Sequence, residues 1–350
     1  MKAKRAGIVF IAACLAIAGS VWLSSQRHLD RSFVSGERVL PELKAQLNAI
    51  TDIRLTKAGG IQTNLHRGDV GWSVVERNYP ADSSKVRKLL LDLAGLEVIE
   101  EKTSDPANYP QIGVQDVTAE HATATRVDFT AGGKTAAILL GNASGAKSGF
   151  VRVPSVARSF LAMPRPATDA EPAQWLDHTL MSVPERRIKQ ASFSGPGGSY
   201  SIAREKPEQA NFSVTGVPRN RKLSGESAGN ASAAGLDTLT LDDVREPAGA
   251  TPAEAARASF TTFDGLRIDA TGHAEGDRRY VIFSAKSSTK DQEHEADTLQ
   301  TRFVGHEFEI PPYKYNAIFR PLEDLLEKPT EPKAAAPGAK PSAAPSAGAQ

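Results

Sequence analysis

Apolar residues recur with a helical period in residues 82–95, the clearest pattern in the chain. Four of them stand at positions i, i+3, i+4 and i+7: Val86, Leu89, Leu90 and Leu93. They share one face of a helix whose other face is polar. Asp82 or Ser83 can accept hydrogen bonds from the free amides of the first turn, and Gly95 suits the end of the helix. The pattern predicts an amphipathic helix that covers a hydrophobic core.

Strand patterns flank this helix. Trp72 and Val74 alternate with Ser73, a two-residue period that predicts a strand with Trp72 against the helix. Pro80 ends that strand, and a second strand is expected after the helix, within the stretch 72–103. The fold class that these elements predict is α+β, with helices packed on an antiparallel sheet.

The same order of elements is expected twice along the chain. In the first half, a brief helix at 39–48 precedes strands at 50–55, 61–65, 125–129, 135–140 and 149–153. About 140 residues later, the strand patterns recur at 188–193, 200–204 and 212–214. This recurrence predicts a diverged internal duplication. It pairs Ile53 with Phe193, Trp72 with Phe212, and Phe129 with Phe260. The region that corresponds to the central helix contains small residues, so that helix is expected to be lost in the second copy.

The N-terminus has the pattern of a membrane-targeting segment. Lys2, Lys4 and Arg5 precede a run without charge, residues 7–23, which is long enough for a short spanning helix. Trp22 near its far end favours a retained anchor with the N-terminus in the cytoplasm and the bulk of the chain in the periplasm. Two alternatives stay open: cleavage after Ala18 or Ser20, and lipidation at Cys14.

These patterns divide the chain into seven parts. They are a cytoplasmic N-terminus at 1–6, a transmembrane anchor at 7–23, a juxtamembrane segment at 24–40, a first α+β repeat domain at 41–164, a linker at 165–187, a second α+β repeat domain at 188–327, and a Pro/Ala-rich tail at 328–350 that is expected to be disordered. The linker carries Trp175, Leu176 and Leu180, which are expected to pack partly. The second domain is expected to close with a strand at 306–313 and a helix at 316–326.

Composition narrows the classes of function. The chain has 350 residues, a net charge of +1, 40% hydrophobic and 24% charged residues, which is typical of a globular protein with room for two domains. A balanced charge without a long basic stripe gives no reason to expect nucleic acid as a partner. Cys14 is the only cysteine, so the exported part must be stable without a disulfide.

A family resemblance rests on an ordered series of residues in the first repeat. The series is Trp72-Ser-Val, Tyr79-Pro-Ala-Asp82, Lys85-Val86, Leu89-Leu90, Leu93-Ala-Gly-Leu96, Glu101-Lys-Thr103, and Tyr109 with Ile112-Gly113-Val114. It resembles an uncharacterised bacterial family, domain of unknown function 4340, over most of residues 41–326. The resemblance implies an envelope protein that is often encoded beside components of gliding-type ABC transporters. It transfers no catalytic residue.

Several short patterns are compatible with an enzyme, each with a simpler interpretation. Ser227 lies in a Gly-x-Ser-x-Gly pattern, with His273 and His294 downstream, but no buried strand precedes it as a nucleophile elbow requires. Gly132-Gly133-Lys134-Thr135 is similar to the end of a phosphate loop, and a hairpin turn explains it better. The Ser-x-x-Lys patterns at 144–147 and 287–290 are expected in loops.

Metal binding has two weak candidates. Glu293-His294-Glu295 and His306-Glu307 offer imidazole and carboxylate ligands. In extended chain, neighbouring side chains point to opposite faces, so an exposed polar loop is the expected alternative to a metal site. No metal, cofactor or catalytic residue is therefore assigned.

The patterns together favour a non-enzymatic accessory or scaffold protein anchored in the bacterial cytoplasmic membrane. Its expected partners are that membrane, through residues 7–23, and a membrane or envelope protein, with ABC transporter subunits as the candidates. The alternatives are a periplasmic hydrolase with Ser227 as nucleophile, and a cell-wall glycan-binding module that would need a groove lined by Trp72, Trp175 or tyrosines.

Overall fold

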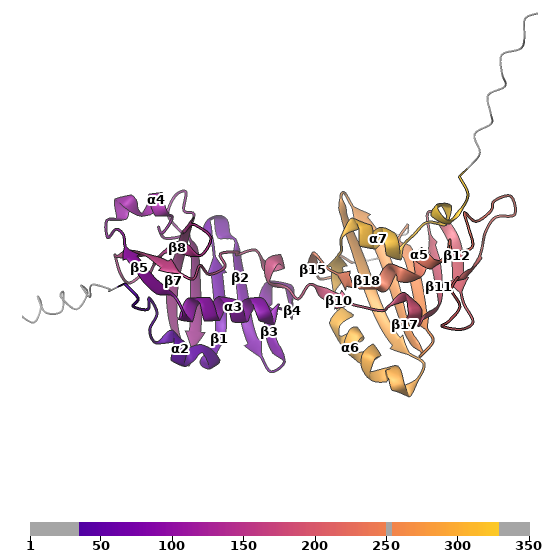
Figure 1. Cartoon of the computed structure of the whole chain (residues 1–350), viewed down its shortest axis with the longest axis horizontal. Coiled ribbons are helices and arrows are strands. Elements are labelled where there is room, and N and C mark those ends of the chain that lie inside the picture. The colour runs from indigo at the N-terminus through magenta and orange to yellow at the C-terminus, as the bar shows by residue number, and fades with distance from the viewer. Residues whose placement is uncertain (1–34, 250–253, 329–350) are drawn as a thin grey trace, which may run out of the picture.

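The computed structural model describes residues 35–249 and 254–328, which form two lobes (Figure 1). Each lobe is built on one large antiparallel sheet with helices packed against it, so the α+β class is confirmed. The expected anchor at 7–23, Cys14 and all but the first residue of the tail lie outside the described residues. Within the described ranges, no helix is both long enough and apolar enough to cross a membrane.

The first sheet contains nine strands. Their order is β4-β3-β2-β1-β6-β7-β8-β9-β5, and the hydrogen-bonded neighbours are antiparallel. In chain order they are β1 Ile50–Thr56, β2 Gln62–Gly68, β3 Gly71–Val74, β4 Tyr79–Pro80, β5 Glu97–Glu101, β6 Thr125–Ala131, β7 Lys134–Ser144, β8 Ser148–Arg152 and β9 Ser159–Met163.

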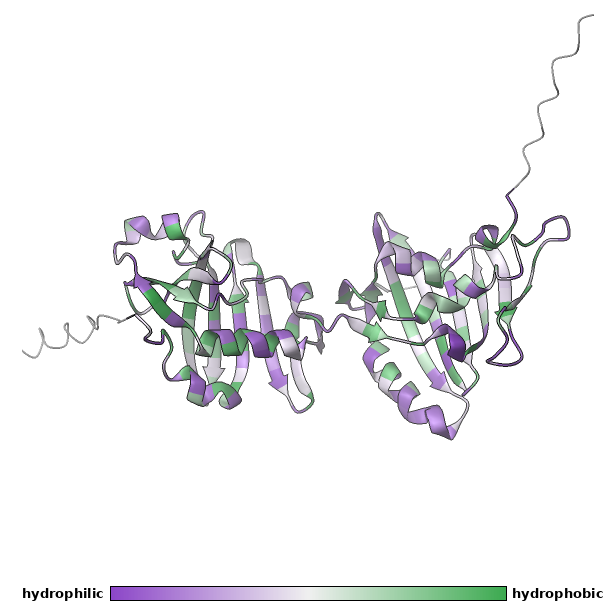
Figure 2. Ribbon diagram, viewed as in Figure 1, coloured by the Kyte–Doolittle hydropathy of each residue, from purple (hydrophilic) through white to green (hydrophobic). Residues whose placement is uncertain are grey.

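The helix expected from the apolar pattern is α3, Ser83–Ala94, and the first lobe also contains α2 Leu43–Gln46 and α4 Tyr109–Ile112. The four apolar residues that predicted α3 are all buried: Val86, Leu89, Leu90 and Leu93. The Asp82 carboxylate accepts hydrogen bonds from the backbone amides of Ser84 and Lys85 at 2.8 and 3.1 Å, and Gly95 caps the other end. Figure 2 shows apolar and polar residues alternating along the strands behind this helix.

The second sheet contains eight strands in the order β13-β12-β11-β16-β17-β18-β19-β15. They are β11 Ile188–Gly195, β12 Gly198–Ala203, β13 Ser213–Thr215, β15 Asp243–Arg245, β16 Ala256–Thr262, β17 Leu266–Glu275, β18 Arg278–Ser287 and β19 Glu307–Glu309. Its helices are α5 Asn230–Ala233, α6 Glu293–Phe303 and α7 Pro312–Ile318. Two further strands, β10 Thr179–Met181 and β14 Leu239–Thr240, pair with each other.

The two sheets repeat one another strand by strand. From β3 to β5, the order of the first sheet matches the order of the second from β13 to β15. Even a β-bulge recurs, between Ile50 and Asp52 and between Ile188 and Gln190, where β1 and β11 pair with β6 and β16. This register corrects one expected pair: the counterpart of Phe193 is Leu55, not Ile53. The repetition supports the predicted duplication, whose origin stays a prediction.

Three expectations about the helices of the second lobe were wrong. The central helix is shortened to α5 and one following turn rather than lost, and Gly235 lies so close to Ala317 and Ile318 of α7 that a Cβ there would be 3.0 Å from their backbone. Residues 293–295, expected as an exposed loop, begin α6, because Ala296 and Phe303 anchor this helix through a narrow apolar face. The closing helix begins at Pro312 instead of Asn316 and ends at Ile318, before Pro321.

The segment between the lobes packs far more completely than expected. Trp175, Leu176 and Leu180 are fully buried. The first part of the segment belongs to the first lobe, where Thr63 donates a hydrogen bond to the carbonyl of Ala170. The later part pairs with β14, so this linker completes both hydrophobic cores.

Candidate functional site

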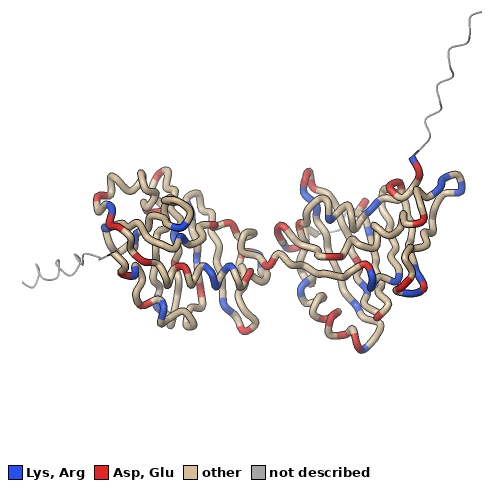
Figure 3. Tube along the Cα trace, viewed as in Figure 1, with Lys and Arg blue, Asp and Glu red and all other residues tan. Residues whose placement is uncertain are grey.

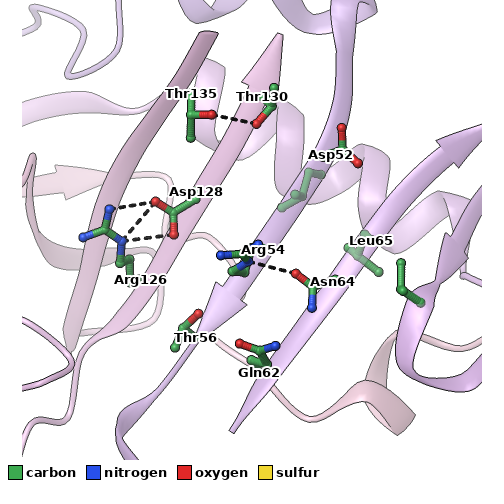
Figure 4. A pocket seen from close by; sticks show the side chains of 12 residues that line it. Asp52, Arg54, Thr56, Gln62, Asn64, Leu65, Arg126, Asp128, Thr130 and Thr135 are labelled. Carbon is green, nitrogen blue, oxygen red and sulfur yellow. Dashed lines mark hydrogen bonds and ion pairs between the residues drawn. The ribbon is translucent and has the colours of Figure 1, made fainter. Parts of the chain in front are cut away.

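A shallow polar basin of about 610 Å³ lies on the open face of the first sheet (Figure 4). Twelve residues line it: Asp52, Ile53, Arg54, Thr56, Gln62, Asn64, Leu65, Val75, Arg126, Asp128, Thr130 and Thr135. They come from β1, β2, β6 and β7 and from the turn that follows β3. The basin is therefore a feature of the sheet itself and is open to solvent.

The alternation of the strands explains why this face is polar. In β1, Ile53 and Leu55 are buried on the side of α3, so Asp52, Arg54 and Thr56 point to the opposite face. Asn64 and Asp128 are the direct cross-strand neighbours of Arg54, in β2 and β6. The same period that builds the core thus brings charged and amide side chains together outside it.

A chain of hydrogen bonds orders the centre of the basin. The Arg54 Nε donates to the Asn64 Oδ1 at 2.9 Å. The Asn64 Nδ2 donates to the Glu76 Oε1 at 2.6 Å, and the Asn64 backbone amide donates to both Glu76 oxygens at 2.9 and 3.0 Å. Glu76 therefore fixes the asparagine, and the asparagine fixes the arginine.

Two ion pairs border the basin. The Arg126 guanidinium holds both oxygens of Asp128 at 2.8 to 3.0 Å, and this hydrogen bonding raises the pKa of Arg126. The Asp52 Oδ1 lies 2.8 Å from the His66 Nδ1, and the hydrogen bond from His66 is the main cause that lowers the pKa of Asp52. Each of these carboxylates already has a partner.

The arrangement offers polar groups that can bind a ligand. The lining residues include no histidine, cysteine or serine, and the hydroxyl groups of Thr130 and Thr135 bond to each other at 2.9 Å. The basin offers amide, hydroxyl and guanidinium groups to a polar ligand.

The family model described as a domain of unknown function (DUF4340) matches residues 72–261. The chain belongs to this family. The matched range begins in β3 of the first sheet and ends in β16 of the second, so one DUF4340 match spans parts of both lobes. No curated protein and no solved structure matches the chain. The match of the family model confirms the resemblance to DUF4340 that the sequence predicted.

The DUF4340 structure does not arrange Ser227 as a nucleophile. Ser227 is exposed in the loop between β13 and α5, and it does not follow a strand directly as in a nucleophile elbow. The ring nitrogens of His273 lie 3.1 Å from Glu275 and 3.6 Å from Glu307, so both face carboxylates. His294 lies on α6.

The other short patterns have structural roles. Gly132 and Gly133 form the β6–β7 turn with φ of 55° and 78°, as a hairpin interpretation predicts. His306 is buried and places its Nε2 3.0 Å from the carbonyl oxygen of Asn78, while Glu307 accepts a hydrogen bond from Arg245. No group of three or more potential metal-ligating side chains occurs in residues 35–249 and 254–328.

The basin itself was missed by the sequence analysis. The available signal was the run of alternating polar residues in three strand patterns, at 52–56, 62–64 and 126–130. Alternation shows that one face of each strand is polar, but not that β1 lies between β2 and β6, whose first residue Thr125 follows the end of β1 by 69 residues. The adjacency that creates the basin is a tertiary property.

Proposed function

We propose that this DUF4340 protein is a non-enzymatic accessory protein of the bacterial envelope. Residues 7–23 anchor it in the cytoplasmic membrane, and the two lobes stand in the periplasm. Its partner is a membrane or envelope protein, and the family resemblance makes ABC transporter subunits the first candidates. The charge pattern of residues 1–23 supports the topology.

One observation carries the proposal: within residues 35–249 and 254–328, no helix lies on the far face of the second sheet, and the far face of the first sheet stays open over β1, β2 and β6, although α4 covers it over β7 and β8. In Figure 1, α3 lies in front of the first sheet, and α5 and α7 lie in front of the second, so both open faces are turned to the same, far side. On the second sheet, a row of side chains crosses six strands: Thr215, Ser201, Ser192, Ser259, Asp269 and Ser284. Short hydroxyl side chains leave such a face accessible to a large partner.

The charge distribution suits a protein partner better than a polyanion. Figure 3 shows basic and acidic residues interspersed over both lobes. A nucleic acid would require a continuous basic surface. A glycan-binding groove is disfavoured because Trp175 is fully buried and Trp72 is half-buried against the core.

Membrane topology gives the first test. A periplasm-specific reporter fused after Lys328 is expected to be active, and the fusion is expected to stay in the membrane fraction after alkaline washing. A cytoplasm-specific reporter at the same position serves as the control. Activity of the cytoplasmic reporter would contradict the proposal, and release by the wash would favour cleavage of the N-terminal segment.

Substitutions on the open face test the accessory role. Ser192→Arg combined with Ser259→Arg places two long cations on the second sheet without touching its core, and we expect it to reproduce the phenotype of a gene deletion in complementation assays. The triple variant Ser227→Ala, His273→Ala, His294→Ala is expected to complement like the wild type. If the double arginine variant complements and the triple alanine variant does not, with both proteins folded and inserted in the membrane, the hydrolase replaces the accessory role as the proposed function.

A further inference from the structure

The guanidinium of Arg54 has an uncommitted edge at the centre of the basin. Its Nε is used in the hydrogen bond to the Asn64 Oδ1, at 2.9 Å. Its two terminal nitrogens make no hydrogen bond and no ion pair to any residue within 35–249 and 254–328. The side chain is exposed, and Figure 4 shows it between β2 and β6, above Thr56 and Gln62.

The group that holds Arg54 is neutral, which is why its charge stays available. A carboxylate bonded to Arg54 would neutralise its charge, and Glu76 is bonded to the same asparagine. Glu76 instead uses both oxygens on Asn64, at 2.6 to 3.0 Å. The asparagine therefore orients the guanidinium without cancelling its charge, and a fixed side chain loses little entropy on binding.

The remaining carboxylates of the basin do not take up this charge either. Asp128 is the cross-strand neighbour of Arg54, but its two oxygens bind Arg126. Asp52 is engaged by the His66 ring at 2.8 Å and by the Thr51 hydroxyl at 2.7 Å. The basin thus combines acids that already have partners with one arginine, Arg54, whose terminal nitrogens have no partner among the described residues.

The geometry points to Arg54 as a binding site for a carboxylate. The two terminal nitrogens of a guanidinium match the two oxygens of a carboxylate and bind them through parallel hydrogen bonds. The hydroxyl of Thr56 and the amide of Gln62, which line the same basin, are further donors at its rim. The carboxylate belongs to an acidic side chain of the partner protein. This source of the carboxylate rests on the proposed function. The binding site at Arg54 is independent of the proposed function.

The second sheet provides an internal comparison. In its matching register, Ser192 stands at the position of Arg54, Ser201 at that of Asn64, and Ser259 at that of Asp128. The backbone framework is kept and the charged network is absent at these three positions. Carboxylate recognition is therefore a property of the first lobe.

Chemical modification of the full-length protein in detergent tests the site directly. Phenylglyoxal reacts with accessible guanidinium groups, and mass spectrometry resolves the rate at each arginine. Arg87, exposed on α3, is the reference. We expect a synthetic peptide of alternating glycine and glutamate to slow modification of Arg54 at least fivefold and to leave Arg87 unchanged. Equal rates at Arg54 with and without carboxylate would overturn the proposal.

Matched variants complete the experiment. The affinity for the labelled peptide should fall at least tenfold in Arg54→Gln, less in Arg54→Lys, which keeps the charge but loses the planar fork, and little in Arg87→Gln, which removes an equal charge elsewhere. Unchanged affinity in Arg54→Gln would also overturn the site. If acetate protects Arg54 to the same extent as the peptide does, at an equal concentration of carboxylate groups, the result supports the site and identifies its ligand as a small acid. The modification rates and the peptide affinities are independent of the topology and complementation tests of the accessory role.

Discussion

Replacement of Trp175 by alanine is expected to lower the free energy of unfolding by about 3 to 5 kcal/mol, because it removes a large, fully buried ring and leaves a cavity. The ring is fixed on two sides. Its Nε1 donates to the carbonyl of Asp169 at 3.1 Å, and the Lys85 ammonium lies 4.8 Å from the ring centre. The backbone carbonyl of Trp175 also accepts a hydrogen bond from the amide of Asp82. Urea unfolding followed by circular dichroism measures the change.

Two variants show whether the loss comes from the cavity. Trp175→Phe keeps most of the buried ring and should cost clearly less than the alanine. Leu91→Ala removes an apolar side chain from the exposed side of α3, where Leu91 is 56% exposed, and should change stability by less than about 0.5 kcal/mol. If Trp175→Ala unfolds like Leu91→Ala, the linker does not complete the core of the first lobe.

Replacement of Arg245 by methionine is the second change with a large expected effect, about 3 kcal/mol of destabilisation. Glu307 is only 2% exposed, and the Arg245 Nε holds it at 2.7 Å. Removing one partner of a buried ion pair costs about 3 to 5 kcal/mol. We expect the low end because Arg245 is 33% exposed. Arg245 also binds both oxygens of Glu275, which holds the pKa of Glu275 at about 2, and covers the ring of Tyr280 at 3.6 Å.

The double variant Arg245→Met, Glu307→Leu isolates the uncompensated charge. Because both charged groups are removed together, it should be more stable than Arg245→Met alone. Its urea midpoint therefore lies between the single variant and the wild type. An additive loss in the double variant would mean that packing over Tyr280, and not the buried carboxylate, accounts for the cost.

Local periodicity was enough to predict the elements whose stability is mainly local. Helix α3, its Asp82 cap and its buried face follow from spacing within 13 residues, since a helix makes its hydrogen bonds within one turn. The hairpin at Gly132 and Gly133 follows from a turn that requires positive φ. Helix α6 escaped prediction because its buried face is narrow and most of its residues are polar.

The sequence by itself determined the α+β class, the core face of α3, the family resemblance and the recurrence of strand patterns. Only the tertiary structure decided which polar residues meet. Arg54 and Asp128 are 74 residues apart and become neighbours because β1 pairs with β6, and Arg245 reaches Glu307 because β15 pairs with β19. Which side chains of a strand are buried depends on the two-residue alternation of apolar and polar positions, and each strand shows this alternation in its own sequence. Which strands pair depends on the free energy of the whole sheet, to which residues far apart in the chain contribute.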